Sequence, residues 1–348
     1  MASASYDKNL KLGLSAVVAA SILFSAKSVF FKMCYAYGTP PAVLQALRGA
    51  FSLPFFLLPF FMGRFRGATA PVPLSKRDLA IIAWLGFSGY YLASIFDMVG
   101  LQYISAGTER LILYIYPTLV VLFGSWFFRK RIPRSMYLPL ALSYAGIALS
   151  FGGEAAAGES GGRPYYGGFL VFLSAVFYAL FLVWQGRMIG RVGPQRLGAL
   201  CMMVSTACIS VQFLAGYPLG ALAQPAPVIW IAVLTSIFCN VLPVYLYGYG
   251  VNLVGAGKAA VVSSVGPVST LVLAGVFLGE STGPLQVGGL CLVVAGTLKL
   301  GMDMNKSTPA SAPAVSGISV QNAGLLPVQV SAGASAEAVP VSGKRGLK

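Results

Sequence analysis

The sequence predicts an all-α membrane protein with ten transmembrane helices arranged as two inverted five-helix repeats. Three observations predict this fold: the composition, the recurrence of apolar segments, and a similarity between the two halves of the chain. Of the 348 residues, 57% are hydrophobic and only 9% are charged, whereas about a quarter of the residues of a soluble domain are charged. Apolar runs of about 20 residues recur, each long enough to cross about 30 Å of hydrocarbon as a helix.

The apolar runs, and the Gly, Pro and polar residues that interrupt them, define the predicted elements. In chain order, the predicted spans are 11–33, 41–62, 78–100, 106–127, 134–152, 165–186, 197–219, 227–249, 256–278 and 284–302. No signal-peptide cleavage pattern precedes the first run, so we expect this run to remain as a signal anchor. Residues 303–348 are rich in Ala, Val, Ser, Gly and Pro without periodicity, which predicts a disordered tail.

Basic residues gather in one alternate set of connections between the spans. This set holds Lys8, Lys11, Arg64, Arg66, Lys76, Arg77, Arg129, Lys130, Arg131, Arg134, Arg187, Arg191 and Arg196. The other set carries little beyond Arg163. By the positive-inside rule, the basic connections face the cytoplasm. We therefore expect the N-terminal segment 1–10 and the C-terminal tail to be cytoplasmic, in a bacterial inner membrane, and we attribute the net charge of +15 to this rule and not to nucleic-acid binding.

The two halves of the chain are related by a constant offset. Residues 100–124 align without gaps on residues 250–274. In this alignment Gly100, Ala106, Gly107 and Pro117 coincide with Gly250, Ala256, Gly257 and Pro267. The alignment predicts a first repeat over 11–152 and a second over 165–302, each with five spans. Because five is odd, the repeats enter the membrane from opposite sides, which is the inverted-repeat architecture of many secondary transporters.

Two motifs also resemble a known family. They are "FSAKSVFFK" (24–32), with Arg48 sixteen residues after its last lysine, and "LQYISAGTERLILYIYP" (101–117). Over about 12–302 the chain is similar to the drug/metabolite transporter superfamily, specifically to its EamA-type bacterial members. The resemblance implies export or exchange of small metabolites. Lys27, Glu109 and Arg110 depart from the family pattern, so the resemblance gives them no role.

Five ionisable residues fall at similar depth in the outer half of the predicted bundle. They are Lys27, Arg48, Asp97, Glu109 and Arg110. A charge near the centre of a bilayer costs about 2.5–3.5 kcal/mol on insertion scales, so each one needs a reason. The equivalent positions of the second half are uncharged: Leu180, Cys201, Tyr247, Ala259 and Ala260. A charged layer that only one half carries favours a functional role over a structural need of the repeat.

The helical periodicity indicates which faces these residues occupy. Tyr90, Ser94 and Asp97 share one stripe of the third span, and Arg110 and Tyr114 share one stripe of the fourth. We expect both stripes to face the interior of the bundle. The serine stripe of the first span is typical of close helix packing.

Lys27 lies about 160° away from the serine stripe on the first span. We expect it to pair with Asp97 or Glu109 inside the bundle; the alternative is a lysine that faces lipid and reaches outward. Purely structural roles are also possible interpretations for the other charged residues of this layer. Glu109 would suit the helix dipole in the first turn of its span, and Arg110 and Asp97 could extend to the outer headgroups.

The residue types in the chain argue against an enzyme. "GFSG" (86–89) has the Gly-x-Ser-Gly pattern of intramembrane serine proteases, but the chain has no histidine to serve as the base. An aspartyl protease needs two membrane aspartates, and only Asp97 qualifies. No P-loop, HExxH or dinucleotide motif occurs, and the five cysteines form no CxxC, so we expect no metal and no cofactor. A lipid flippase or a channel remains an alternative, although no channel filter pattern is present.

The sequence therefore predicts a secondary transporter of a small polar metabolite, with amino acids the first candidates. We expect a central cavity between spans 1, 3, 4, 6, 8 and 9. The predicted substrate-binding residues are Arg48, Arg110 and Lys27 for an anionic group, and Tyr90, Tyr114 and Tyr247 for hydrogen bonds and aromatic walls. Glu109 or Asp97 is the predicted coupling group, because desolvation favours a protonated carboxyl.

One other substrate class fits the same residues. The alternative is an organic-anion or phosphate-ester exchanger in which Lys27, Arg48 and Arg110 clamp the anion. The expected partners are a small-molecule substrate and the lipid bilayer, without nucleic acid. Protons as the coupling ion and a homodimer are left open.

Overall fold

The computed structural model describes residues 2–65, 73–128, 136–157 and 163–307. Within these ranges the chain is helical and has no strand. The elements are α1 Ala2–Ala36, α2 Pro41–Phe65, α3 Lys76–Leu85, η1 Gly86–Leu92, α4 Ala93–Gly100, α5 Ala106–Leu113, α6 Tyr116–Phe128, α7 Tyr137–Ala157, α8 Pro164–Val192, α9 Pro194–Gly216, η3 Leu219–Leu222, α10 Ala226–Ser236, η4 Ile237–Val241, α11 Leu242–Val254, α12 Ala256–Ser263, α13 Val265–Leu278 and α14 Pro284–Ser307.

Each of the ten predicted ranges contains helix, and eight of them hold a helix long and apolar enough to cross a membrane. The other two ranges are occupied by α7 and α14. The prediction of an all-helical membrane fold is thus confirmed, with eight spans supported by length and composition within the described ranges. Several helices extend past their predicted ends, α1 and α14 among them. α1 begins at Ala2 and α14 continues to Ser307, because no Gly or Pro interrupts either extension; residues 308–348 of the predicted tail lie outside the described residues.

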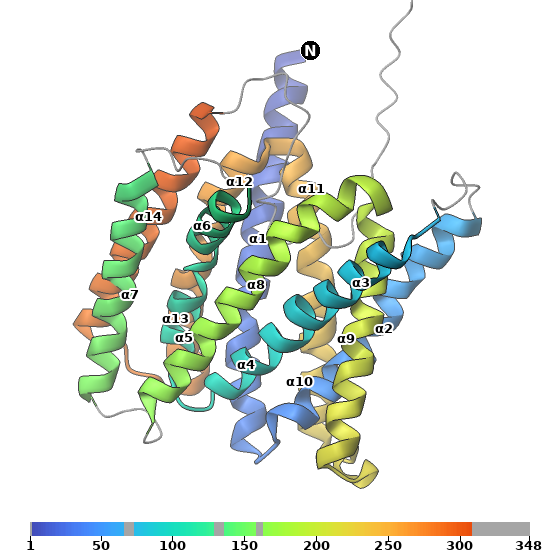
Figure 1. The fold of residues 1–348 in the computed structure, drawn as a ribbon. Coiled ribbons are helices and arrows are strands. Elements are labelled where there is room, and N and C mark those ends of the chain that lie inside the picture. Colours follow the sequence, from blue (N-terminus) through green and yellow to red (C-terminus); the bar gives the residue numbers. More distant parts are fainter. Residues whose placement is uncertain (1, 66–72, 129–135, 158–162, 308–348) are drawn as a thin grey trace, which may run out of the picture.

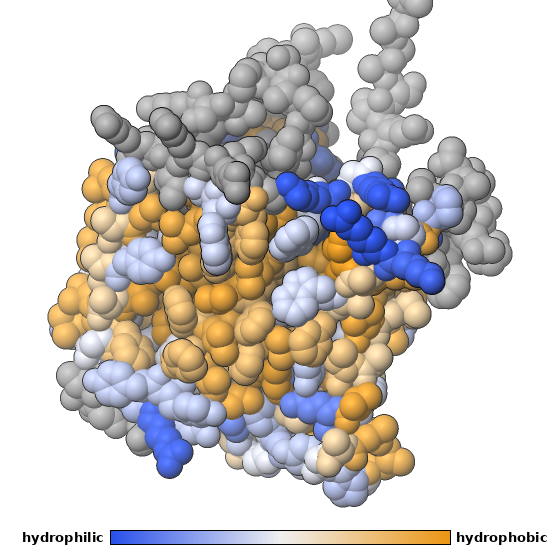
Figure 2. Space-filling model, in the orientation of Figure 1, coloured by the Kyte–Doolittle hydropathy of each residue, from blue (hydrophilic) through white to orange (hydrophobic). Residues whose placement is uncertain are grey.

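Helices from the two halves of the chain pack against each other. α1 contacts α11 and α13, α2 contacts α9, α4 contacts α8, and α7 contacts α14. In Figure 1, α1 descends from the N-terminus while α8 rises in the opposite direction. Figure 2 shows a broad hydrophobic belt across the middle of one face, with hydrophilic residues gathered above and below it. This distribution matches a bundle whose sides contact lipid and whose ends contact water.

The third and eighth predicted spans are not continuous α-helices. Each contains a π-helical segment, η1 or η4, at equivalent positions of the two halves. A π-helical turn holds an extra residue and often occurs at functional sites. In η1, a Cβ on Gly89 would collide with the ring of Phe181 on α8, and the hydroxyl of Ser174 on α8 donates to the carbonyl of Ala93 at 2.6 Å. The segment and the residue after it therefore pack tightly against α8 at residues that line the cavity described below.

The fourth and ninth spans are also interrupted, between α5 and α6 and between α12 and α13. Each break lies just before a proline, Pro117 or Pro267. A proline inside a helix removes one N–H and leaves the carbonyl four residues earlier without its helical donor. For Pro267 this carbonyl belongs to Ser263, and it accepts a hydrogen bond from the Tyr114 hydroxyl at 2.8 Å. A side chain of the first half thus satisfies the helix break of the second.

The crossing of α7 and α14 depends on glycine. A Cβ added to Gly146 would lie 2.5 Å from the carbonyl oxygen of Gly289 on α14. Gly146→Ala should therefore force the helices apart and lower the free energy of unfolding by about 1–3 kcal/mol, seen as a lower melting temperature in detergent. Gly152→Ala on the same helix is the matched control, because a Cβ there meets nothing within 4 Å. Equal melting temperatures of the two variants would contradict this account of the crossing.

Candidate functional site

A central cavity of about 230 Å³ lies between the two halves of the bundle. Its walls come from α1, α2, η1, α4, α5, α6, α8, α9, η4, α11 and α12. The expectation of walls from spans 1, 3, 4, 6, 8 and 9 was too narrow, because α2 and α9 also contribute. These two helices pack against each other and against the π-helical segments, which brings Arg48 and Ser205 to the cavity surface.

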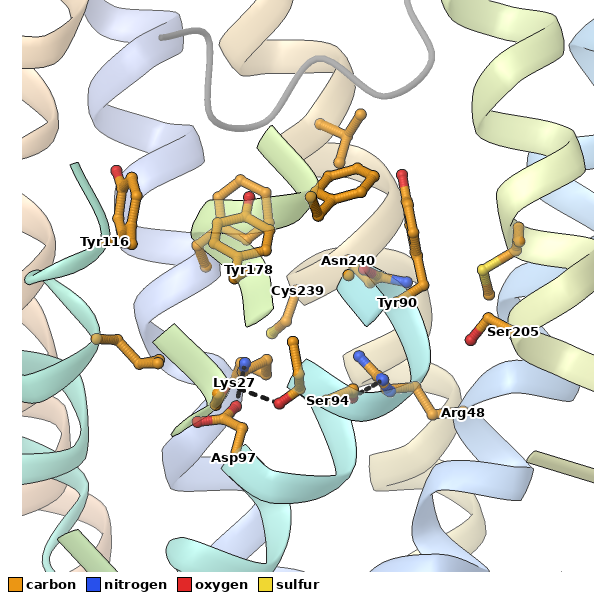
Figure 3. Close-up of a pocket in the computed structure, with 18 of the residues that line it drawn as sticks. Lys27, Arg48, Tyr90, Ser94, Asp97, Tyr116, Tyr178, Ser205, Cys239 and Asn240 are labelled. Atoms are coloured by element: carbon orange, nitrogen blue, oxygen red, sulfur yellow. Dashed lines mark hydrogen bonds and ion pairs between the residues drawn. The ribbon is translucent and has the colours of Figure 1, made fainter. Parts of the chain in front are cut away.

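Lys27 and Asp97 form an ion pair in the cavity wall. The Lys27 ammonium lies 2.8 Å from one carboxylate oxygen of Asp97 (Figure 3), and the side chains are 20% and 4% exposed. The predicted pairing of Lys27 inside the bundle is confirmed, and the alternative of a lipid-facing lysine is wrong. Asp97 is too deeply buried to reach the headgroups. Pairing offsets the large cost of removing each charge from water.

Arg48 also faces the cavity, but it forms no ion pair with any described residue. One guanidinium nitrogen donates to the Ser94 hydroxyl, the guanidinium lies 5.7 Å from the Phe31 ring centre, and Nε has no hydrogen-bond partner in the described ranges. The backbone around it is held by α10, since the Ser236 hydroxyl donates to the Arg48 carbonyl at 3.2 Å. The guanidinium therefore keeps hydrogen-bonding capacity directed at the cavity.

Arg110 repeats this arrangement on α5. Its guanidinium carbon lies 5.9 Å from the centre of the Tyr114 ring, and one guanidinium nitrogen makes a long hydrogen bond of 3.5 Å to the Ser25 hydroxyl. Nε of Arg110 has no partner within the described part of the chain, and no carboxylate there forms an ion pair with it. Two guanidinium groups thus line one small cavity without a carboxylate of their own.

Glu109 does not line the cavity. Its side chain is fully buried next to Asp97. Glu109 lies in the first turn of α5, as the helix-dipole alternative expected, but other side chains bond the N–H groups there. The Ser105 hydroxyl accepts from the Thr108 N–H, and Glu280 accepts from the Ala106 N–H at 3.0 Å. A coupling role for Glu109 would therefore have to act through Asp97 and not by direct contact with a substrate in this cavity.

The three tyrosines expected at the site, Tyr90, Tyr114 and Tyr247, all line the cavity. Tyr247 hydrogen-bonds the side chain of Ser263, the same residue whose carbonyl accepts from Tyr114. Tyr90 packs edge-on against Phe181 with ring centres 5.2 Å apart. The aromatic walls thus reach from the first half of the chain to the second.

The cavity also contains residues that the sequence analysis missed: Tyr116, Tyr178, Gln185, Ser205, Cys239 and Asn240. The repeat offset would have found Asn240, because it is the counterpart of Tyr90 (Figure 3). Tyr116 could not be found from periodicity, because in a straight helix it would face away from Arg110, and only the break before α6 turns it inward.

Polar contacts close the end of the bundle where α1 meets α2. Lys32 on α1 forms an ion pair with Glu280, which follows α13, and Glu280 also accepts from the start of α5. The Thr39 hydroxyl donates to Gln224 at 2.8 Å across the same end. The cavity extends the other way, from Arg48 to Phe56, about 12 Å further along α2.

Comparison with known proteins identifies the chain. It is 29% identical over 286 residues to the uncharacterized transporter YcbK of Bacillus subtilis (strain 168), a match that spans 79% of this chain and 89% of the relative. It is 25% identical over 243 residues to a protein named "probable terminal-alkyne amino-acid exporter" from Streptantibioticus cattleyicolor, covering 67% of this chain and 78% of that one. These relatives are named as transporters and not as enzymes.

The fold is also similar to that of a protein whose crystal structure has been solved. It superposes with a TM-score of 0.59 at 17% identity, over 87% of this chain and 99% of the other. The model of the EamA-like transporter family matches residues 11–152 and again residues 165–302. The two matches account for both halves of the bundle. The chain therefore belongs to the EamA-like transporter family.

Proposed function

We propose that this transporter carries a small metabolite with a carboxylate or another anionic group, amino acids being the first candidates. It does so as a ten-span, inverted-repeat secondary transporter of the bacterial inner membrane. The observation that carries the proposal is the pair of guanidinium groups, Arg48 and Arg110, that line the cavity without a carboxylate partner among the described residues. A guanidinium donates planar, charge-assisted hydrogen bonds that match a carboxylate.

The size and walls of the cavity support a small amphipathic substrate. Its volume of about 230 Å³ is below the range of about 300–1,000 Å³ typical of drug-sized ligands. Tyr90, Tyr114 and Tyr247 offer hydroxyls next to apolar ring surface. An amino acid has a carboxylate for the arginines and a side chain for these rings. The relative named as a probable amino-acid exporter supports the same choice.

The arrangement of closed and open ends supports transport by alternating access. The Lys32–Glu280 ion pair closes one end, and the cavity extends from the charged layer towards the other. With the N-terminus cytoplasmic, as the basic connections favour, the closed end is external and this conformation faces inward. Because no ATPase motif occurs in the sequence, the transport would be driven by a gradient or by exchange.

The second candidate is an exchanger of organic anions or phosphate esters. Two arginines in one cavity favour it too, because guanidinium groups bind phosphate in a bidentate manner. The third member of the predicted clamp weakens it, since Lys27 already pairs with Asp97. A phosphate ester would therefore meet two available cations instead of three.

Counterflow in proteoliposomes tests the proposal. Purified protein is reconstituted, vesicles are loaded with a mixture of unlabelled amino acids, and entry of each labelled amino acid is followed against protein-free liposomes. Transient accumulation of at least one labelled amino acid is the expected result. Accumulation of a labelled sugar phosphate, with no amino acid transported, would instead favour the second candidate. No accumulation of either class would contradict both.

A further inference from the structure

Two buried carboxyl groups, Asp97 and Glu109, lie against each other behind the cavity wall. Glu109 is 0% exposed and Asp97 is 3% exposed. Both oxygens of Glu109 and Oδ1 of Asp97 receive no hydrogen bond from any N–H or O–H group of the described residues. The two side chains lie within hydrogen-bonding reach of each other. Two ionised carboxylates cannot hydrogen-bond, so this contact is stabilising only with a proton between them.

The charged groups around the two carboxyls are consistent with one bound proton. On α1, Lys27 pairs with Oδ2 of Asp97, whereas the Tyr35 hydroxyl donates to the Met98 carbonyl at 2.8 Å and not to either carboxyl. Arg110 on α5 and Arg48 on α2 act on the carboxyls through longer-range attraction without forming an ion pair. From α8, which packs against α4 and α5, the described side chains bring no charge to this place.

We propose that Asp97 and Glu109 form one proton-binding site that holds a single shared proton at neutral pH. The proton bridges Glu109 and Oδ1 of Asp97, while Oδ2 of Asp97 keeps its ion pair with Lys27. The shared proton satisfies both groups, because among the described residues Glu109 has no donor and Asp97 has one oxygen without a donor. Binding the proton changes the charge of the pair from two negative charges to one.

This site would couple protons to the transported anion, a consequence that rests on the proposed function. Lys27, Arg48 and Arg110 face one net negative charge when the pair holds its proton, and two when it does not. An anionic substrate therefore binds more tightly to the protonated site, and the substrate and the proton are carried together. By linkage, the affinity for such a substrate should fall by up to about tenfold per unit rise in pH over the range in which the pair loses its proton.

Infrared spectroscopy tests the site without any substrate. A protonated carboxyl has a C=O stretching band apart from the amide bands, and it shifts in D₂O. The chain has only nine Asp and Glu residues, so a single protonated carboxyl is resolvable in a maltoside detergent, which has no carbonyl group. We expect this band in the wild-type protein at pH 7, and its loss in both Asp97→Asn and Glu109→Gln. Each substitution leaves one carboxyl beside Lys27 and Arg110, where it ionises.

Glu154→Gln is the matched control, because Glu154 is also buried but accepts hydrogen bonds from the N–H and hydroxyl of Ser105 at 2.6 Å. These bonds hold Glu154 at the start of α5, apart from the Asp97–Glu109 pair, so the band should persist in this variant. No band in the wild type would overturn the proposal whether or not the variants fold. Persistence in Asp97→Asn would show that Glu109 is protonated alone, and loss in Glu154→Gln would assign the proton to Glu154; either result overturns the shared site. Counterflow would remain an independent measure of the proposed function.

Discussion

Arg48→Gln should reduce counterflow of the transported anion by at least about 30-fold. The substitution keeps a side chain able to bond Ser94 but removes the positive charge and the guanidinium fork. Truncating one partner of a buried, hydrogen-bonded charge pair costs about 2–5 kcal/mol, and each 1.4 kcal/mol is tenfold in affinity. Arg48 is held at the cavity by α2 and by the Ser236 hydroxyl on α10.

Two controls separate substrate binding from stability in this experiment. Arg163→Gln removes one arginine from the exposed start of α8, outside the cavity, and should leave counterflow within about twofold of the wild type. The melting temperature of Arg48→Gln should not fall, because the guanidinium has no ion pair to lose among the described residues and a buried charge is costly. Counterflow at the wild-type level in Arg48→Gln would exclude Arg48 from the substrate site.

Much of the fold follows from hydropathy alone. Apolar runs and their breakers located helix in every predicted range, since a chain in lipid must satisfy its backbone within helices. The irregular places escaped prediction for a physical reason. A π-helical turn such as η1 is favoured by packing between helices, here Gly89 against Phe181, and hydropathy does not register such packing. Pro117 is a residue that can interrupt the helix of the fourth span. The position of the break, about one turn before Pro117, depends on the contacts of α5 and α6 with other helices.

The charged layer was predictable because charge in an apolar segment is conspicuous. Helical phase correctly directed Asp97 and Arg110 inward, and the pairing of Lys27 followed from the need for a counter-charge. The sequence did not show which of the two carboxyls pairs with Lys27. Asp97 and Glu109 are on different helices, and their relative depth in the membrane depends on how those helices pack. The same limit explains why Glu109 was expected near the substrate and is found behind Asp97.

Lys27→Met should lower both the melting temperature and counterflow, and Asp97→Asn should partly restore the stability. Loss of Lys27 leaves a buried negative charge on the Asp97–Glu109 pair, and breaking a buried ion pair from one side costs about 3–5 kcal/mol; the 20% exposure of Lys27 places the cost towards the lower end. Removing the Asp97 charge as well eliminates the uncompensated charge. The double-mutant cycle should therefore give a favourable coupling energy between about 0.5 and 3 kcal/mol.

Lys32 provides the matched control for this cycle, because it lies on the same helix and pairs with a different carboxylate, Glu280. Lys32→Met should be destabilising on its own, yet Asp97→Asn should add to that loss and not relieve it, since no contact joins the two sites. Rescue must therefore depend on which lysine is removed. If Asp97→Asn stabilised both lysine variants equally, the effect would reflect removal of any buried negative charge, and the Lys27–Asp97 pair would have no specific role in the charged layer.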